Sequence, residues 1–231
     1  MKILPAVIIC LALLAGCRTN SVRNYWDSHS IDYSDIEKAE DQFASFAEVA
    51  VASPFEDASA AIDGLFDLMK KDEVAYYIYS SWMDGAFYSI LSPCRSAALY
   101  SKAVERIVSD GVLSGSECEP FLQKREWIQY NQVGKKAVVP GLNISERTLV
   151  LVLDQGCPSC REALSALASK TELADVRHVA LCCGYGPSPT VPGWEYITPE
   201  DASSVFDPSM TPVHFIVAAD GTVESSYQLT L

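Results

Sequence analysis

A pair of cysteines between a strand pattern and a helix pattern constrains the fold of this chain more than any other feature. Cys157-Pro158-Ser159-Cys160 follows a β-branched and apolar run, residues 148–153, which predicts a buried strand. After the pair, residues 161–170 carry leucines at helical spacing. Further on, Thr211-Pro212 stands at the head of a second apolar run, residues 213–217. A strand, a Cys-x-x-Cys pair and a helix in this order are typical of a redox motif.

The position of the pair predicts different roles for its two thiols. A cysteine at a helix start lies among unpaired backbone N–H groups, which favour the reactive thiolate, and Pro158 suits the first helical turn. Cys157 is therefore the candidate nucleophile, and Cys160, one turn further on, is the candidate resolving thiol. The alternatives are a structural disulfide or half of a metal site, although so short a ring constrains the unfolded chain only weakly.

The first residues have the pattern of an export signal. Met1 and Lys2 precede an apolar stretch, residues 3–14, and the small residues Ala15 and Gly16 lead to Cys17. The sequence Leu14-Ala15-Gly16-Cys17 resembles a bacterial lipobox, which implies cleavage before Cys17 and lipidation of that cysteine. No other apolar run approaches the ~20 residues of a membrane span. We expect residues 1–16 to be a signal peptide and the mature chain to be anchored through its lipid.

The charge of the chain argues against nucleic acid as a partner. Removal of residues 1–16 takes away one base, Lys2, and leaves sixteen basic residues against 30 acids, a net charge of −14. Such an acidic chain lacks the basic surface that nucleic acids require.

The cysteines that remain after Cys17 are even in number. This number permits disulfides in an oxidising compartment without requiring them. The remaining cysteines are Cys94, Cys118, Cys157, Cys160, Cys182 and Cys183.

Residues 17–33 are predicted to be a tether and residues 34–134 an all-helical domain. Apolar stripes and breaks predict five helices, starting at Ser34-Asp35, after Ser53-Pro54, near Ala75, at Ser92-Pro93, and at a capping box over Ser116–Glu119. The third is expected to run to Leu91 and the fourth to end at Gly111. Aromatic residues crowd the segment 76–88, where they could line a groove but more often form the core of a bundle.

Cys94 and Cys118 are not expected to form a disulfide. Each is predicted near the start of its own helix, and the intervening helix rises about 24 Å. In an antiparallel pair the two starts then lie too far apart for an S–S bond. Both thiols are expected to be buried as small hydrophobic groups.

From residue 135 to residue 231 the pattern changes to that of an α/β domain. Val138-Val139 suggests a short strand, and the strands at 149–153 and 176–183 flank a helix, which predicts a parallel, right-handed crossover. Residues 184–209 read as a loop with one short helix from Pro199, and residues 213–229 as a hairpin turning at Asp220-Gly221. The predicted fold class is therefore α + α/β, with a mixed central sheet in the second domain.

Cys182-Cys183 ends a predicted parallel strand at the edge where Cys157 should lie. Four thiols there could relay electrons or bind a soft metal such as Cu(I), or Cys182 and Cys183 could point to opposite faces and be unreactive. His29, His178 and His214 have no metal-ligand spacing, so we expect neither a metal nor another cofactor. Asp154 and Glu162 are the nearest acids for proton transfer, although each could be a solvated surface group.

Residues 148–228 resemble the TlpA-like branch of the thioredoxin family. The resemblance is carried by Cys157-Pro158-Ser159-Cys160, Thr211-Pro212 and Asp220-Gly221-Thr222. It implies that Cys157 attacks, that Cys160 resolves, and that Pro212 is a cis-proline which contacts the substrate backbone together with Thr211. The helical region is more loosely similar to an uncharacterised domain that precedes such modules in some Gram-negative lipoproteins.

Three features of the chain differ from that family pattern. Leu151 stands where the family commonly has an acid in the strand before the cysteines. Gly156 stands where an aromatic residue is usual, and the sequence ends at Leu231, so we expect the closing helix to be missing. Loss of the acid should slow proton transfer from Cys160.

The sequence therefore predicts a lipid-anchored thiol-disulfide oxidoreductase of the bacterial cell envelope, at the outer membrane and facing the periplasm. Its expected partners are protein thiols or disulfides and an electron donor, with reduction of partner disulfides favoured by the resemblance alone. The alternative from another class is a non-catalytic, partner-binding lipoprotein whose cysteine pair is structural or idle. A weaker alternative is a copper-binding protein.

Overall fold

The computed structural model describes residues 22–154, 157–183, 191–225 and 227–229. The chain divides into two compact units, and the division falls within one helix, between Arg125 and Glu126. The boundary predicted at residues 134 and 135 therefore lies nine residues further along the chain than the observed one. Cys17, Gly156 and the signal peptide lie outside the described residues.

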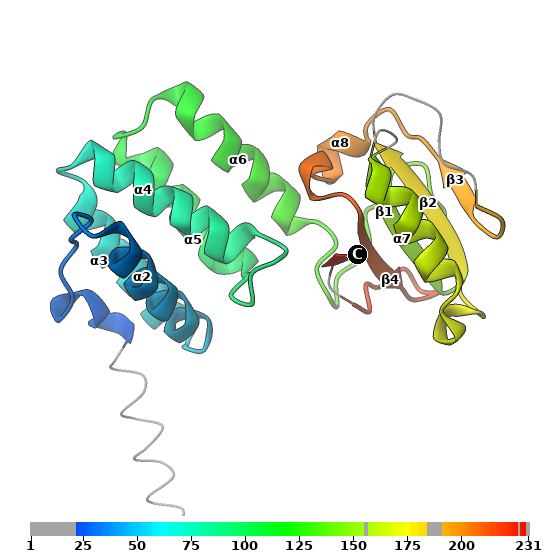
Figure 1. Cartoon of the computed structure of the whole chain (residues 1–231), viewed down its shortest axis with the longest axis horizontal. Coiled ribbons are helices and arrows are strands. Elements are labelled where there is room, and N and C mark those ends of the chain that lie inside the picture. The colour runs from blue at the N-terminus through cyan, green and yellow to red at the C-terminus, as the bar shows by residue number, and fades with distance from the viewer. Residues whose placement is uncertain (1–21, 155–156, 184–190, 226, 230–231) are drawn as a thin grey trace, which may run out of the picture. The chain divides into compact units, whose positions relative to one another are not determined.

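The first unit is helical, as predicted (Figure 1). Its elements are η1 (Tyr25–Asp27), α2 (Ile36–Val51), α3 (Phe55–Met69), α4 (Glu73–Met83), η2 (Asp84–Tyr88), α5 (Ala97–Asp110) and α6 (Gly115–Gln129), the last of which crosses the boundary. Asp35 caps α2 by accepting a hydrogen bond from the Lys38 N–H, and the stripe predicted for this helix is buried. The α5 helix ends at Gly111, which adopts the left-handed conformation with φ +66°.

Two predicted helix starts are wrong because a neighbouring serine provides the cap. The α5 helix begins after Ser96, whose side chain accepts from the Leu99 N–H, whereas the Ser92 hydroxyl accepts from the Cys94 N–H in the turn before it. At α6 the capping box is formed by Ser114, whose N–H donates to Glu117 Oε2 over 2.7 Å. The predicted third helix also stops early, since α4 gives way to the π-helical turn η2.

The segment predicted as a tether is packed from residue 22 onward. Val22 and Trp26 are buried, and the Trp26 ring lies 5.1 Å from the Phe46 ring and 6.4 Å from the Tyr79 ring. The Tyr25 hydroxyl donates to the Gln42 carbonyl. Hydrophobic burial therefore holds residues 22–33 on the helices, in place of the free linker that their composition suggested.

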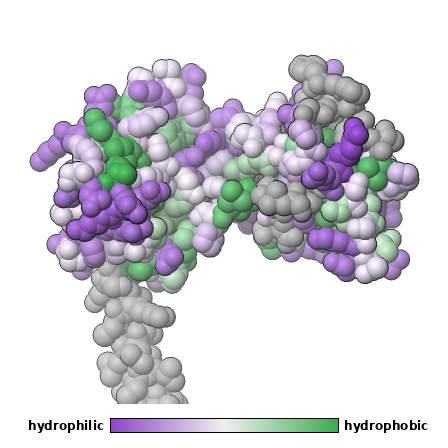
Figure 2. Space-filling view, in the orientation of Figure 1, coloured by the Kyte–Doolittle hydropathy of each residue, from purple (hydrophilic) through white to green (hydrophobic). Residues whose placement is uncertain are grey.

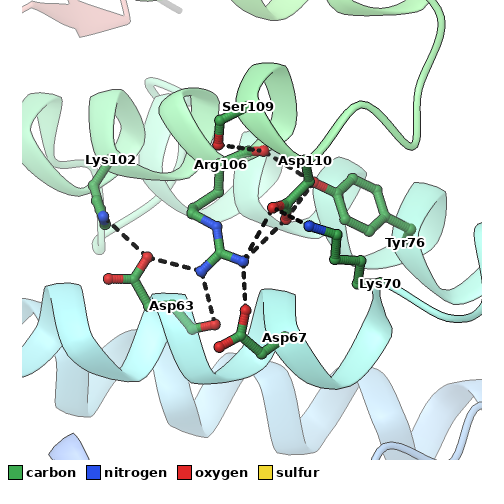
Figure 3. A network of polar contacts seen from close by, with 8 residues as sticks. All are labelled: Asp63, Asp67, Lys70, Tyr76, Lys102, Arg106, Ser109 and Asp110. Carbon is green, nitrogen blue, oxygen red and sulfur yellow. Dashed lines mark hydrogen bonds and ion pairs between the residues drawn. The ribbon is translucent and has the colours of Figure 1, made fainter.

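A network of charged side chains joins α3 to α5 (Figure 3). The Arg106 guanidinium on α5 donates to Asp63 and Asp67 of α3 and to Asp110 one turn along its own helix. Asp110 also accepts from Lys70 and from the Tyr76 hydroxyl. Burial by itself would raise the pKa of Asp110, but these hydrogen bonds outweigh it and hold that pKa below its usual value.

The aromatic residues of segment 76–88 mostly form the core of this unit. Tyr76, Tyr79, Phe87 and Tyr88 are buried, while Tyr77 is exposed. Figure 2 shows a cluster of apolar residues on the helical unit within a largely polar face. Exposed apolar side chains are common on folded proteins, so this cluster alone identifies no partner.

The second unit contains a five-stranded mixed sheet in the order β3-β2-β1-β4-β5. The strands are β1 (Thr148–Asp154), β2 (Arg177–Cys183), β3 (Glu195–Ile197), β4 (Val213–Val217) and β5 (Gln228–Leu229), with α7 (Pro158–Ala168), η3 (Thr171–Leu173), α8 (Ala202–Val205) and η4 (Pro208–Met210) between them. β1 pairs with β2 in parallel and with β4 antiparallel, which confirms the predicted crossover and the mixed sheet. Helix α7 covers one face of β1 and β2 (Figure 1).

Two details of this unit differ from the prediction. Val138 forms no strand, because the Asn131 side chain bonds both the N–H and the C=O of Val138, the groups that a strand would use. The segment predicted as a loop contains β3, which pairs in parallel with β2 at the sheet edge. The Asp220-Gly221 turn is present, with Gly221 at φ +84°, and Val223 bridges Val217.

Candidate redox site

The two cysteines of the motif lie where β1 meets α7. Cys157 is the N-cap residue of α7, and Pro158 is its first residue, where the missing N–H costs nothing. The Cys157 N–H donates to the Asp154 carbonyl over 3.1 Å, and the Cys160 N–H donates to the Cys157 carbonyl over 3.2 Å. The local turn thus fixes Cys157 at the helix start and Cys160 one turn inside.

Cys157 lies in surroundings that stabilise its thiolate. Its side chain is half-buried, and its Sγ lies 3.0 Å from the Ser159 hydroxyl oxygen. Burial alone would raise the pKa of Cys157, but hydrogen bonds with the Cys160 thiol, the Ser159 hydroxyl and backbone N–H groups outweigh it. The net effect is a pKa of Cys157 below that of an ordinary thiol, so this cysteine is the better nucleophile.

Cys160 is fully buried in the apolar core between α7 and the sheet. Burial, the hydrogen bond with Cys157 and the negative charges of Cys157 and Asp154 raise the pKa of Cys160 to about 12. The two thiols are therefore perturbed in opposite directions. This asymmetry gives the pair one reactive and one protected sulfur.

The Thr211–Pro212 peptide bond is cis, as the resemblance implied. Val213, directly after Pro212, pairs with Val152 near the carboxyl end of β1. The cis-proline therefore lies at the same end of the sheet as the cysteine pair. The Thr211 hydroxyl donates to the Pro208 carbonyl over 3.0 Å, which ties the segment to η4.

Cys182 and Cys183 are the last two residues of β2 at this same end of the sheet, and they lie on opposite faces of the strand. Cys182 is in register with Leu153 and belongs to the core beneath α7, whereas Cys183 is in register with Asp154. Both are buried, and burial, with the nearby charges of Cys182 and Asp154, raises the pKa of Cys183 to about 12. Within the described ranges, no cluster of three or more His, Cys, Asp or Glu side chains could hold a metal ion.

The histidines do not form a common site among the described residues. His29 stacks on Tyr25, and His178 contacts the Leu173 carbonyl and the Trp194 ring. His214 is buried on β4, in register with Leu151. Glu162 is exposed on α7, whereas Asp154 ends β1 beside the pair.

Ser159 was not predicted from the sequence as a site residue, although its hydroxyl oxygen lies 3.0 Å from Cys157 Sγ. The sequence signal that could have indicated this role is the position of Ser159 between the two cysteines. The helical unit contributes two free, buried cysteines, Cys94 and Cys118, and the prediction that they are not bridged is confirmed. Cys94 lies in the turn before α5, however, and not at a helix start.

Comparison with known proteins supports the fold. Neither a known family profile nor a curated protein matches this chain. Among solved structures, it is similar to a thioredoxin-like protein from Bacteroides caccae, with a TM-score of 0.68, 18% sequence identity, and coverage of 92% of this chain and 89% of the other. The chain thus consists of a helical unit followed by a thioredoxin-like α/β unit, and the likeness extends over both.

Proposed function

We propose that this chain is a thiol-disulfide oxidoreductase that reduces disulfides of partner proteins through Cys157 and Cys160. The observation that carries the proposal is the asymmetry of the pair. Cys157 is half-buried at a helix start and bonded to donors that lower its pKa, whereas burial keeps the Cys160 thiol protonated. The thioredoxin-like fold of the second unit is compatible with this chemistry.

The reaction transfers two electrons from the protein dithiol to the partner disulfide. The Cys157 thiolate attacks one partner sulfur, a mixed disulfide forms, and the other partner sulfur leaves as a thiolate. The Cys160 sulfur then loses its proton and attacks Cys157 Sγ, which closes the Cys157–Cys160 disulfide and releases the second partner thiol. A donor dithiol must afterwards reduce the pair. Thr211 and Pro212 would contact the partner backbone.

We place this activity in the bacterial cell envelope, with the chain anchored through a lipid on Cys17 to the outer membrane and facing the periplasm. The support is the sequence of the first 17 residues, where an apolar stretch ends in Leu-Ala-Gly-Cys. No helix among the residues that the structure describes is long and apolar enough to cross a membrane. Mass spectrometry of the purified mature protein would detect a lipid on Cys17, and an unmodified Cys17 would contradict the anchor.

The deciding experiment measures the reduction potential of the pair and the pKa of its reactive thiol. We expect a thiol pKa below the ~8.5 of free cysteine and a potential within the range of known oxidoreductases. Cys157→Ser should abolish disulfide reduction, with Cys94→Ser as the matched control that leaves it intact. A potential below about −300 mV without a reactive thiolate would mean a structural bridge. The non-catalytic alternative predicts instead that partner binding survives replacement of both Cys157 and Cys160 by serine.

A further inference from the structure

A buried carboxylate lies just before the turn that leads to the cis-proline. Asp207 has an exposed fraction of only 9%, although it belongs to a segment between short surface elements. It directly precedes η4, and that turn is followed by Thr211 and the cis-Pro212. This segment lies at the end of the sheet that carries the cysteine pair. The conformation of the turn therefore bears on how the cis-proline is presented.

The Asp207 side chain holds the turn through two short hydrogen bonds. Its Oδ1 accepts from the Ser209 N–H over 2.9 Å and from the Ser209 hydroxyl over 2.6 Å. The Asp207 carbonyl accepts from the Met210 N–H over 3.2 Å. The Pro208 carbonyl then accepts both the N–H and the hydroxyl of Thr211, over 3.4 and 3.0 Å. These bonds fix successive residues of the turn, from the buried carboxylate to the residue before the cis-proline.

The chain on the other side of Asp207 is fixed by aromatic packing. Phe206 is buried, and its ring lies 6.1 Å from the Phe215 ring of β4 and 6.3 Å from the Tyr227 ring. The Phe206 N–H also donates to the Ala202 carbonyl of α8 over 2.9 Å. Asp207 thus joins a packed aromatic side chain to the segment of the cis-proline.

The same pair of bonds occurs at two other turns, where the acid is exposed. Asp32 accepts from the N–H and the hydroxyl of Ser34. Asp220 accepts from the N–H and the hydroxyl of Thr222. Both acids are exposed, so a turn of this kind forms without burial of its carboxylate. Because burial of a charged group costs free energy, the burial of Asp207 reflects its place beside the cis-proline segment and not a need of the turn itself.

We propose that Asp207 is a positioning residue, which holds η4 so that Thr211 and Pro212 meet the backbone of a partner protein. This inference rests on the oxidoreductase function proposed above, in which those two residues contact the partner. A partner polypeptide needs this surface, whereas a small disulfide needs only the Cys157 sulfur. Loss of the Asp207 carboxylate should therefore weaken the reaction with a protein disulfide and spare the reaction with a small one.

The test compares two probes on the purified mature protein. Turnover of insulin disulfides, with dithiothreitol as the electron donor, gives KM and kcat for a protein partner, and a chromogenic aromatic disulfide reports attack by Cys157. Loss of one hydrogen bond to a charged group changes an equilibrium about tenfold or more, so we expect Asp207→Ala to raise the KM for insulin about tenfold. The kcat and the rate with the aromatic disulfide should change little. Asp207→Asn keeps an acceptor oxygen for Ser209 and should recover most of the parent KM.

Asp220→Ala is the matched control, because it removes the same kind of turn bond beyond the opposite end of β4, and it should leave both probes unchanged. An unchanged KM for insulin in Asp207→Ala would overturn the proposal, as would an equal loss with both probes. If Asp207→Ala fails to fold, Ser209→Ala decides, since it removes the 2.6 Å bond from an exposed side chain, and an unchanged KM there also overturns it. A parent protein that reduces neither probe would instead contradict the oxidoreductase function itself.

Discussion

The two units each place a cysteine at a helix start, with opposite results. Cys118 lies in the first turn of α6, and Cys157 caps α7. The Cys118 thiol faces the carbonyls of Ile107 and Leu113, at 3.9 and 3.8 Å, and burial raises its pKa. Cys157 instead meets the Ser159 hydroxyl and backbone N–H groups, and its pKa falls.

This contrast shows that a helix start alone does not activate a thiol. Burial raises the pKa of both thiols; at Cys157 hydrogen bonds outweigh that effect, whereas at Cys118 the negative charge of Glu117 adds to it. In the helical unit, polar groups pair with one another, as in the network around Arg106. In the thioredoxin-like unit, the hydrogen-bonding groups around Cys157 lie at an edge of the sheet, where its partly exposed sulfur can react.

The largest expected difference is in alkylation rate at neutral pH. The pKa of Cys160 is about 12 and that of Cys157 lies below that of an ordinary thiol, so the thiolate fractions of these two cysteines differ by roughly a thousandfold or more. The pKa of Cys118 is also raised by burial. Iodoacetamide labelling followed by peptide mass spectrometry should therefore modify Cys157 first and Cys118 only slowly. Equal labelling of Cys118 and Cys157 would show that the two thiols do not differ in reactivity.

Removal of Arg106 should destabilise the helical unit by about 3 kcal/mol, because the nearly buried Asp110 would lose its main partner. The matched control in the other unit is Arg177→Ala, which removes an ion pair to the half-exposed Glu195 and should cost no more than about 1 kcal/mol. Urea unfolding of both variants measures the difference. Equal costs would show that the network contributes no more than a surface ion pair.

Acid should weaken the helical unit through Asp110. A carboxylate whose pKa is lowered in the folded state adds stability above its unfolded pKa of about 3.9, and that stability is lost as pH falls through the folded value. Asp110→Asn lacks this titration, so its stability should change less between about pH 5 and about pH 2. Urea denaturation monitored by circular dichroism at each pH tests this. Parallel curves for the parent and the variant would rule out a contribution from Asp110.

The smallest expected effect concerns Ser159. A hydrogen bond to a charged group is worth roughly 1.5–3 kcal/mol, so Ser159→Ala should raise the pKa of Cys157 by about one unit. A less stable thiolate also disfavours the reduced pair, and each tenfold change in that equilibrium lowers the potential by about 30 mV. Thiolate absorbance against pH measures the first effect. Ser116→Ala at the start of α6 is the control, and an unchanged Cys157 titration in Ser159→Ala would remove Ser159 from the site.

Much of this organisation could be predicted from local patterns. The stripe of α2, the glycine end of α5 and the order of strand, cysteine pair and helix all depend on residues close together in sequence. Helix starts were predicted wrongly where two nearby serines could each provide the N-cap. Ser92 and Ser96 both precede a helical pattern, as do Ser114 and Ser116, and only the observed hydrogen bonds distinguish them.

The order of the residues alone shows which side chains could react, because Cys157, Pro158 and Cys160 set the turn, the helix start and the two thiols within four positions. It also determined the helical and α/β character of the two units through their apolar periodicities. The neighbours of each group, by contrast, are set by the three-dimensional packing. Trp26 packs on Phe46 and Tyr79, although its segment was predicted to be a tether. Strand register brings Asp154 beside Cys183. Such contacts join residues far apart in the chain, and their energies come from burial and pairing that no local pattern contains.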